Sequence, residues 1–346
     1  MRSDEALLAF HTPPRQFTPM SPLTITSSVL TATLLPQGAA LVGLRHHKIP
    51  HDLVLGFADP AAHASVPIYA GALVGPVANR IANGEITLDG VRYQLPRNEA
   101  GETTLHSGPD GLHAETWHTL THETDSITFT TTLQPNACGL PGTRHIRATY
   151  ALLDCTLTLK ITATTDAPTP LNIAAHPYWN LDGTVDLSGH QLHLATDHYL
   201  PTNSKNLPTG EIKSARGSAL DFTETAKIPR IPDLDVNYCL ADAPRTAPCY
   251  AATLIGQSGA TLRIATTAPG LQVYNGAFLP NLTGVLRGHR DLGPYGAVAL
   301  EPQHWPDAPN QPGFPAITLR PGATYTQITT YEINDKSALP TALRPE

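Results

Sequence analysis

A single carboxylate, Glu301, stands where a strand pattern gives way to prolines in this 346-residue sequence. The apolar run Tyr295–Leu300 before it is typical of a buried strand. Prolines recur between residues 302 and 312, which predicts that the strand ends at Glu301 and that a stiff loop, neither strand nor helix, follows it. A carboxylate at the lip of a strand suits a pocket. A strand-ending glutamate beside an ordinary surface loop fits the local pattern at least as well.

The segment Leu171–Leu181 holds a second candidate, His176, beside Tyr178, Trp179 and Asn180. A pyranose has an apolar C–H face and a polar rim, so aromatic rings next to amides suit a sugar. Histidine titrates near neutral pH and can exchange protons with a substrate. The segment therefore suits a sugar site.

Polar residues elsewhere extend this constellation. Asn79 and Arg80 lie among small apolar residues, where arginine is seldom buried unless it is paired or bound to a ligand. His106 lies in a loop of small residues, and Asp235 and Gln272 lie in short polar motifs. Each has an ordinary structural explanation when taken alone, such as an ion pair for Arg80. Only their combination indicates a site.

Short alternating segments predict the strands that must position these residues. The clearest is a hairpin over residues 85–95, which alternates on both sides of Asp89-Gly90, a dipeptide suited to a type I′ turn. Further hairpins are predicted over residues 146–164 and 251–266. More than a dozen strand patterns, with no amphipathic helix longer than ten residues, predict an all-β fold: a large single-domain antiparallel β-sandwich.

The domain is expected to span residues 23–333. Residues 1–22 are predicted to be a loose N-terminal lead-in, in which Met20 is an alternative start to Met1, and residues 334–346 a loose C-terminal tail. The N-terminus lacks the pattern of a signal peptide, and no run approaches the ~20 apolar residues of a membrane span. The four cysteines show no C-x-x-C spacing, which favours incidental thiols. We therefore expect a cytoplasmic protein.

Composition excludes several function classes. A net charge of −7 and a pI near 6.1 argue against nucleic acid or an anionic membrane as a partner, because both require a basic face. No glycine-rich phosphate loop appears. The 16 histidines raise the question of a metal. However, no H-E-x-x-H motif exists, and the spacing of His193 and His198 places them on opposite faces of a strand. No metal site is expected.

Taken together and in order, the motifs resemble the aldose 1-epimerase (galactose mutarotase) family from about residue 25 to about residue 333. The matching motifs are Asn79-Arg80-Ile81, Leu105-His106, Asn172–Leu181, Pro208-Thr209-Gly210-Glu211, Asp235 with Asn237, Pro269-Gly270-Leu271-Gln272, and Glu301–Pro312. The sequence departs from the family pattern at Pro76, Ser107 and Val236.

The resemblance implies a galactose mutarotase-like supersandwich. It also implies an enzyme without a cofactor that interconverts the α and β anomers of free aldohexoses such as galactose and glucose. His176 then corresponds to the general acid and Glu301 to the general base. The implied sugar-binding residues are Asn79, Arg80, His106, Asp235 and Gln272, with Tyr178, Trp179 and Asn180 lining the site. At ordinary pKa values of ~4.3 and ~6.5, Glu301 is ionised at neutral pH and His176 is about one-quarter protonated.

Two other functions remain open at this point. A non-catalytic carbohydrate-binding sandwich has no need for both His176 and Glu301. An epimerase for a phosphorylated hexose needs extra basic residues at the pocket, for which Arg287, His289 and Arg290 are a possible source. The sequence leaves the preferred aldose open, and the oligomeric state open between a monomer and a weak dimer.

Overall fold

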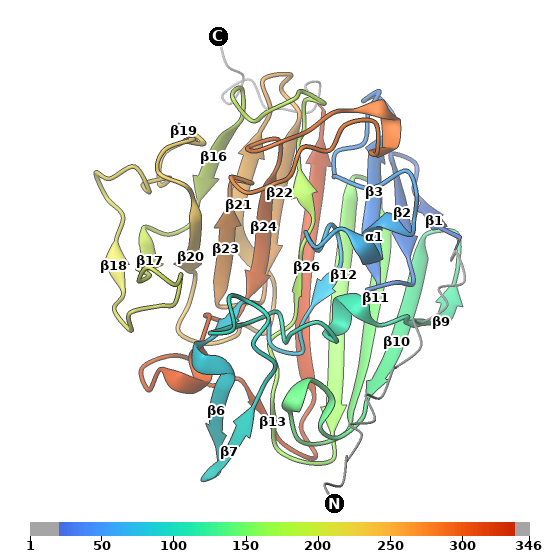
Figure 1. The fold of residues 1–346 in the computed structure, drawn as a ribbon. Helices are drawn as coiled ribbons and strands as arrows, with labels where there is room; N and C mark the ends of the chain where they lie inside the picture. The colour runs from blue at the N-terminus through green and yellow to red at the C-terminus, as the bar shows by residue number, and fades with distance from the viewer. Residues whose placement is uncertain (1–20, 336–346) are drawn as a thin grey trace, which may run out of the picture.

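Two large antiparallel sheets dominate the computed structural model, which describes residues 21–335 (Figure 1). In spatial order, the nine-stranded sheet consists of β19 (Ala226–Lys227), β16 (Gln191–Leu194), β21 (Cys249–Ile255), β22 (Thr261–Thr266), β26 (Tyr325–Asn334), β12 (Thr156–Thr165), β11 (Arg144–Leu153), β10 (Ser126–Leu133) and β9 (His118–His122). The six-stranded sheet consists of β15 (Tyr178–Trp179), β24 (Val298–Gln303), β23 (Gly270–Tyr274), β20 (Asp235–Cys239), β17 (His198–Leu200) and β18 (Lys213–Ser214).

Smaller elements complete the domain. A three-stranded sheet and four strand pairs are formed by β1 (Leu23–Thr26), β2 (Leu30–Leu35) and β3 (Ala40–His46), then β4 (Leu73–Val74) with β14 (Ala174–Ala175), β5 (Arg80–Ile81) with β8 (Thr104–Leu105), β6 (Glu85–Leu88) with β7 (Val91–Gln94), and β13 (Thr169–Pro170) with β25 (Thr318–Leu319). The helical elements are α1 (Ala62–Ser65) and the 3-10 turns η1 (Ala82–Gly84), η2 (Leu112–Ala114), η3 (Ala137–Gly139), η4 (Arg287–His289) and η5 (Ala308–Asn310).

The predicted all-β sandwich is confirmed. The hairpin at Asp89-Gly90 joins β6 to β7 with positive φ at both residues, as its turn type requires. None of the helices in residues 21–335 has both the length and the apolar character that a membrane crossing requires. All four cysteines are free thiols.

A shared core explains how the two sheets pack. Side chains alternate between the faces of a strand, so one face of each sheet can be apolar. Leu271 and Val298 of the six-stranded sheet belong to the same buried cluster as Ile264 and Tyr331 of the nine-stranded sheet. Gln272 lies between the core residues Leu271 and Val273 of β23 and points to the opposite face. The six-stranded sheet therefore presents polar side chains on the face away from the core.

The prediction that a strand ends at Glu301 is wrong. Strand β24 continues through Pro302 to Gln303, and Pro302 lies opposite Leu271 of β23. The proline is tolerated because β15 pairs only with the first two residues of β24, which leaves that side of the strand without a partner. The Pro302 carbonyl accepts a hydrogen bond from Gln327 Nε2 at 3.1 Å, and proline has no main-chain N–H that would need a partner.

Candidate active site

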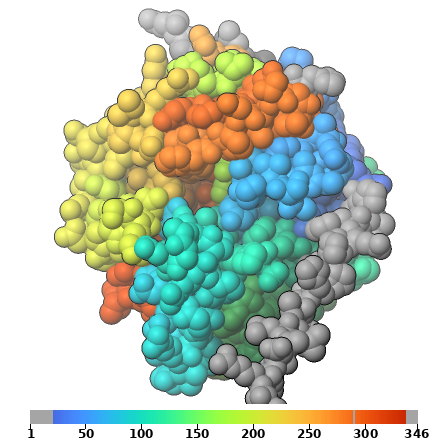
Figure 2. Space-filling view, in the orientation of Figure 1, coloured from blue at the N-terminus to red at the C-terminus, as the bar shows by residue number. Residues whose placement is uncertain are grey.

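A cavity of about 380 Å³ opens on the outer face of the six-stranded sheet. Blue, cyan, yellow-green and orange surfaces, from segments far apart in the sequence, meet around this hollow (Figure 2). Its lining includes residues 67–69, 79–80 and 278–279, with residues of β23 and β24. All but two of the predicted site residues line it, namely Asn79, Arg80, His106, His176, Tyr178, Asp235, Gln272 and Glu301.

Strand register places Glu301 on the cavity floor. Glu301 lies directly opposite Gln272 of β23, and Gln272 lies opposite Asn237 of β20. Opposed residues on one face have Cβ atoms only ~5 Å apart. The Gln272 amide donates to Asp235 Oδ1 at 2.6 Å, so a row of polar side chains crosses three strands.

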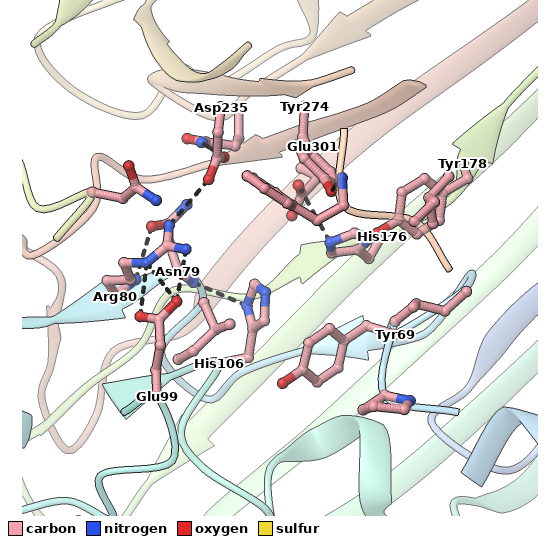
Figure 3. A pocket seen from close by; sticks show the side chains of 17 residues that line it. Tyr69, Asn79, Arg80, Glu99, His106, His176, Tyr178, Asp235, Tyr274 and Glu301 are labelled. Carbon is pink, nitrogen blue, oxygen red and sulfur yellow. Dashed lines mark hydrogen bonds and ion pairs between the residues drawn. The ribbon is translucent and has the colours of Figure 1, made fainter. Parts of the chain in front are cut away.

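His176 lies where the chain passes from one sheet pair to another. Strand β14 pairs with β4 just before it, and β15 pairs with β24 just after it. The main-chain N–H of His176 donates to Ala72 at 2.9 Å, and its carbonyl accepts from Gly71. These bonds hold the imidazole over β24, with Nε2 3.5 Å from Glu301 Oε1 (Figure 3).

Burial changes the protonation of this pair. Desolvation lowers the pKa of His176 to about 4, with a further contribution from nearby His113. Desolvation also raises the pKa of Glu301 well above its usual range, and the Asp235 carboxylate adds to the shift. The expectation of an ionised glutamate and a partly protonated histidine is therefore reversed. Burial favours a proton of the pair on Glu301 rather than on His176.

Asn172 ties together three segments that carry site residues. Its side chain accepts a hydrogen bond from the His304 N–H at 2.9 Å and donates to the His304 carbonyl at 3.3 Å. Its main-chain N–H and carbonyl bond to Pro76 and Ala78, each at 2.7 Å. Asn172 is 1% exposed. It thus joins the strand before His176 to the strand that carries Glu301 and to the segment before Asn79.

Arg80 is held between two carboxylates. Its Nε and Nη2 form a two-pronged contact with Glu99, with Nε–Oε2 at 2.9 Å and Nη2–Oε1 at 2.8 Å, and Nη1 donates to Asp235 Oδ2 at 3.2 Å. Burial alone would lower the pKa of Arg80, but the two carboxylates raise it overall. Sequence reasoning missed Glu99. The sequence indicated only that a buried arginine needs a partner, which does not identify the residue that provides it.

His106 is fixed as a neutral donor. Its Nδ1 accepts a hydrogen bond from the Asn79 N–H at 3.1 Å, so the proton of the neutral ring lies on Nε2. Burial, together with His176, lowers the pKa of His106 well below its usual range. The rings of Tyr69 and His106 meet edge to face at 4.7 Å. The ring therefore offers an N–H donor rather than a charge.

Trp179 and Asn180 do not line the cavity. Neighbouring residues of a strand point to opposite faces, so Tyr178 faces the cavity while Trp179 enters the core and packs against Tyr331. The Asn180 amide donates to main-chain carbonyls, including that of Gly296 at 2.7 Å. Both positions were taken from a motif. The pleat turns Trp179 away from the pocket, and Asn180, which lies beyond the end of β15, is held by its main-chain hydrogen bonds.

The proline loop after β24 is not part of the cavity rim. It contains the 3-10 turn η5, although no helical turn was predicted there. Asp307 accepts a hydrogen bond from the Ala82 N–H at 3.0 Å, and its own N–H donates to the Arg80 carbonyl at 3.1 Å. The loop therefore supports the strand that carries Arg80.

The arginines considered as binding residues for the phosphate of a phosphorylated hexose lie outside the cavity. Arg287 lies 3.6 Å from Asp52, and Arg290 donates to the carbonyl of Val54 at 3.3 Å. Neither Arg287 nor Arg290 lines the cavity. The side chain of His289 lies outside the part of the chain that the structure describes. The departures at Pro76, Ser107 and Val236 also lie outside its lining.

Aromatic lining residues were only partly accessible to sequence reasoning. Tyr274 lies two residues after Gln272 on the same strand, so alternation alone places both on one face. Tyr69 and Phe278 also line the cavity, and no local pattern marked either. Phe278 is 74% exposed at the opening.

An all-β sandwich with a buried histidine–glutamate pair in a polar cavity defines an enzyme with an acid–base site. Comparison with known proteins gives the family. The family model described as aldose 1-epimerase matches residues 22–332. This chain therefore belongs to the aldose 1-epimerase family and is an isomerase.

Similar proteins cover most of the chain. A galactose mutarotase of Rattus norvegicus is 36% identical over 82% of this chain and 84% of its own. An aldose 1-epimerase of Escherichia coli is 31% identical over 88% of this chain and 92% of its own. The crystal structure of an aldose epimerase homologue from C. elegans matches with a TM-score of 0.85 and 31% identity, over 91% of this chain and 99% of that one.

Proposed function

We propose that this isomerase exchanges the α and β anomers of free aldohexoses such as galactose and glucose, with His176 and Glu301 as its acid and base. The observation that carries the proposal is the buried pair of His176 Nε2 and Glu301 Oε1, 3.5 Å apart in a cavity of about 380 Å³. Two groups that share one proton can give and take a proton in the same step.

Ring opening and closure use the pair in opposite directions. Opening begins when the proton of the pair moves from Glu301 to His176. Glu301 then takes the proton of the C1 hydroxyl while protonated His176 gives its proton to the ring oxygen, and the bond from C1 to the ring oxygen breaks. After rotation about C1–C2, Glu301 returns its proton to the aldehyde oxygen and His176 takes one back. Opening thus ends at the neutral pair that burial favours.

Other cavity groups suit the hydroxyls of a sugar. Gln272 Oε1 and Glu301 Oε2 are buried acceptors with no hydrogen-bond partner among the described residues. An unpaired buried acceptor costs ~1–3 kcal/mol, so hydroxyl donors from a ligand would be favoured there. His106 Nε2 supplies a donor, and the rings of Tyr178 and Tyr274 offer apolar surface.

Polarimetry with fresh α-galactose, α-glucose and glucose 6-phosphate tests the proposal. The protein should accelerate mutarotation of the two free sugars. His176→Asn and Glu301→Gln should each lower kcat by ~10²–10⁴-fold. His193→Asn is a matched control, since His193 bonds Tyr250 on the nine-stranded sheet, outside the cavity.

Each alternative has a distinct result. No acceleration with any of the three sugars indicates a non-catalytic binding module, and acceleration with glucose 6-phosphate alone indicates an epimerase for phosphorylated hexoses. A His176→Asn variant that keeps most of its turnover would show that the acid has been misassigned.

A further inference from the structure

The contact between Arg80 and Glu99 occupies the part of the guanidinium that best binds anions. Nε and Nη2 form the planar fork that matches a carboxylate or a phosphate with two parallel hydrogen bonds. Glu99 fills this fork with both carboxylate oxygens, at 2.9 Å and 2.8 Å. Thr103 Oγ1 donates to Glu99 Oε2 at 2.6 Å and fixes the carboxylate in place.

The cavity also carries an excess of negative charge. Among the described residues that line it, Arg80 is the only lysine or arginine, whereas Glu99 and Asp235 are both carboxylates that contact it. Burial keeps the two lining histidines neutral, because it lowers the pKa of His106 and of His176. With Glu301 protonated, the lining still has one more negative charge than positive charges.

We propose that Glu99 is a specificity-determining residue through which the site discriminates against aldoses that bear a carboxylate or a phosphate. It acts in two ways: it occupies the arginine fork that such a group would bind, and it leaves the cavity net negative. Glu99 and Asp235 both line the cavity, so a negatively charged substituent on a bound sugar meets Coulomb repulsion from both carboxylates. The proposal rests on the proposed function, since it concerns the substrate class of the same site.

Anomer exchange measured by NMR on equilibrated galactose and galacturonate tests it, because this measurement needs no pure anomer. Glu99→Gln keeps the shape and one acceptor for Arg80 but removes the charge, and Glu99→Ser opens the fork. Glu102→Gln is the matched control: Glu102 lies on the same loop, pairs with Lys205 at 2.6 Å and is absent from the cavity lining.

The expected readout is the ratio of kcat/KM for galactose to that for galacturonate. This ratio should fall roughly 5- to 30-fold in Glu99→Gln, further in Glu99→Ser, and stay unchanged in Glu102→Gln. The wild-type ratio should also fall as salt is raised, because salt screens the repulsion. Competitive inhibition of galactose exchange by galacturonate, stronger in Glu99→Gln than in wild type, supplies a second readout when galacturonate turnover is too slow to measure.

A Glu99→Gln variant that loses galactose and galacturonate activity equally, with unchanged inhibition, overturns the proposal, because Glu99 would then only hold Arg80. Failure of the proposed function looks different: the wild-type protein would exchange neither sugar.

Discussion

One proton shared by His176 and Glu301 decides the chemistry of the cavity at the scale of single residues. The two pKa values cross relative to their ordinary order, since burial lowers that of His176 to about 4 and raises that of Glu301. Two interacting groups of this kind titrate as a coupled pair. The ionic and the neutral arrangement of the pair hold the same single proton, so the proposed proton exchange can use the pair whichever group carries that proton at rest.

The imidazole of His176 should therefore stay neutral at physiological pH in the free protein. We expect its ring nitrogens, followed by NMR, to show no protonation as the pH falls from 8 to 5 and to titrate only towards pH 4. His176→Asn assigns the signal by its loss. A midpoint near 6.5, the ordinary value for histidine, would contradict the burial argument.

Glu301 should make the wild-type protein less stable as the pH rises. Its pKa in the folded state is above its unfolded value, so its favourable contribution is complete below pH ~4.5 and is lost as the pH rises through the folded pKa. Glu301→Gln removes this loss, at about 1.4 kcal/mol per pH unit between the two pKa values. Calorimetry at pH 5 and pH 8 should show a Tm advantage of Glu301→Gln that grows with pH. Glu332→Gln, the same change on the nine-stranded sheet, serves as the control, and an equal trend there would remove Glu301 as the cause.

At the scale of elements, Asn172 fixes the relative positions of the three chain segments that carry site residues. The proposed pair of His176 and Glu301 depends on this arrangement. Asn172→Leu leaves the main-chain N–H and carbonyl of His304 without their partners, which costs ~1–3 kcal/mol for each group. A small shift between the strands of His176 and Glu301 should also lower kcat by ~10- to 100-fold while KM changes little. Asn172→Asp keeps the acceptor but not the donor, so its kcat and Tm should lie between those of the wild-type protein and those of Asn172→Leu. Steady-state polarimetry and Tm together separate the cases: a lower Tm with unchanged kcat would show that Asn172 serves stability alone.

The same scale shows what the sequence can predict. Local period and turn chemistry were enough for the hairpins, because Asp89-Gly90 and the alternation around it are contained in ten residues. Strand β24 was predicted to end at Glu301, because the lack of a strand partner beyond β15, which lets Pro302 continue the strand, is a long-range property that the local sequence does not show. The placement of Trp179 followed a motif, whereas the pleat turns it into the core. Glu99 was not predicted as a site residue, because the fold brings it to Arg80 and no sequence spacing marks the pair.

The whole molecule is built so that the cavity and the core depend on each other. Strand β26, near the C-terminal end of the described residues, pairs with β12 on one side and β22 on the other, and so joins the two halves of the nine-stranded sheet. The six-stranded sheet that forms the cavity floor shares its buried cluster with this sheet. Neither sheet keeps an apolar core if the other is removed.

We therefore expect residues 23–333 to unfold as one cooperative unit. The three tryptophans report on this, because Trp117 and Trp179 lie in the core shared by the sheets and Trp305 lies in a separate buried cluster. In urea, the fluorescence shift, the loss of β-sheet circular dichroism and the loss of mutarotase activity should share one midpoint. Tryptophan-to-phenylalanine variants that retain only Trp179 or only Trp305 should give equal midpoints once corrected for their own stability. A Trp305 signal that changes well before that of Trp179 would mean that the Trp305 cluster, which contains Val77 and Ile81 on either side of Asn79 and Arg80, melts on its own. The arginine side of the cavity would then be a separate folding unit from the histidine–glutamate side.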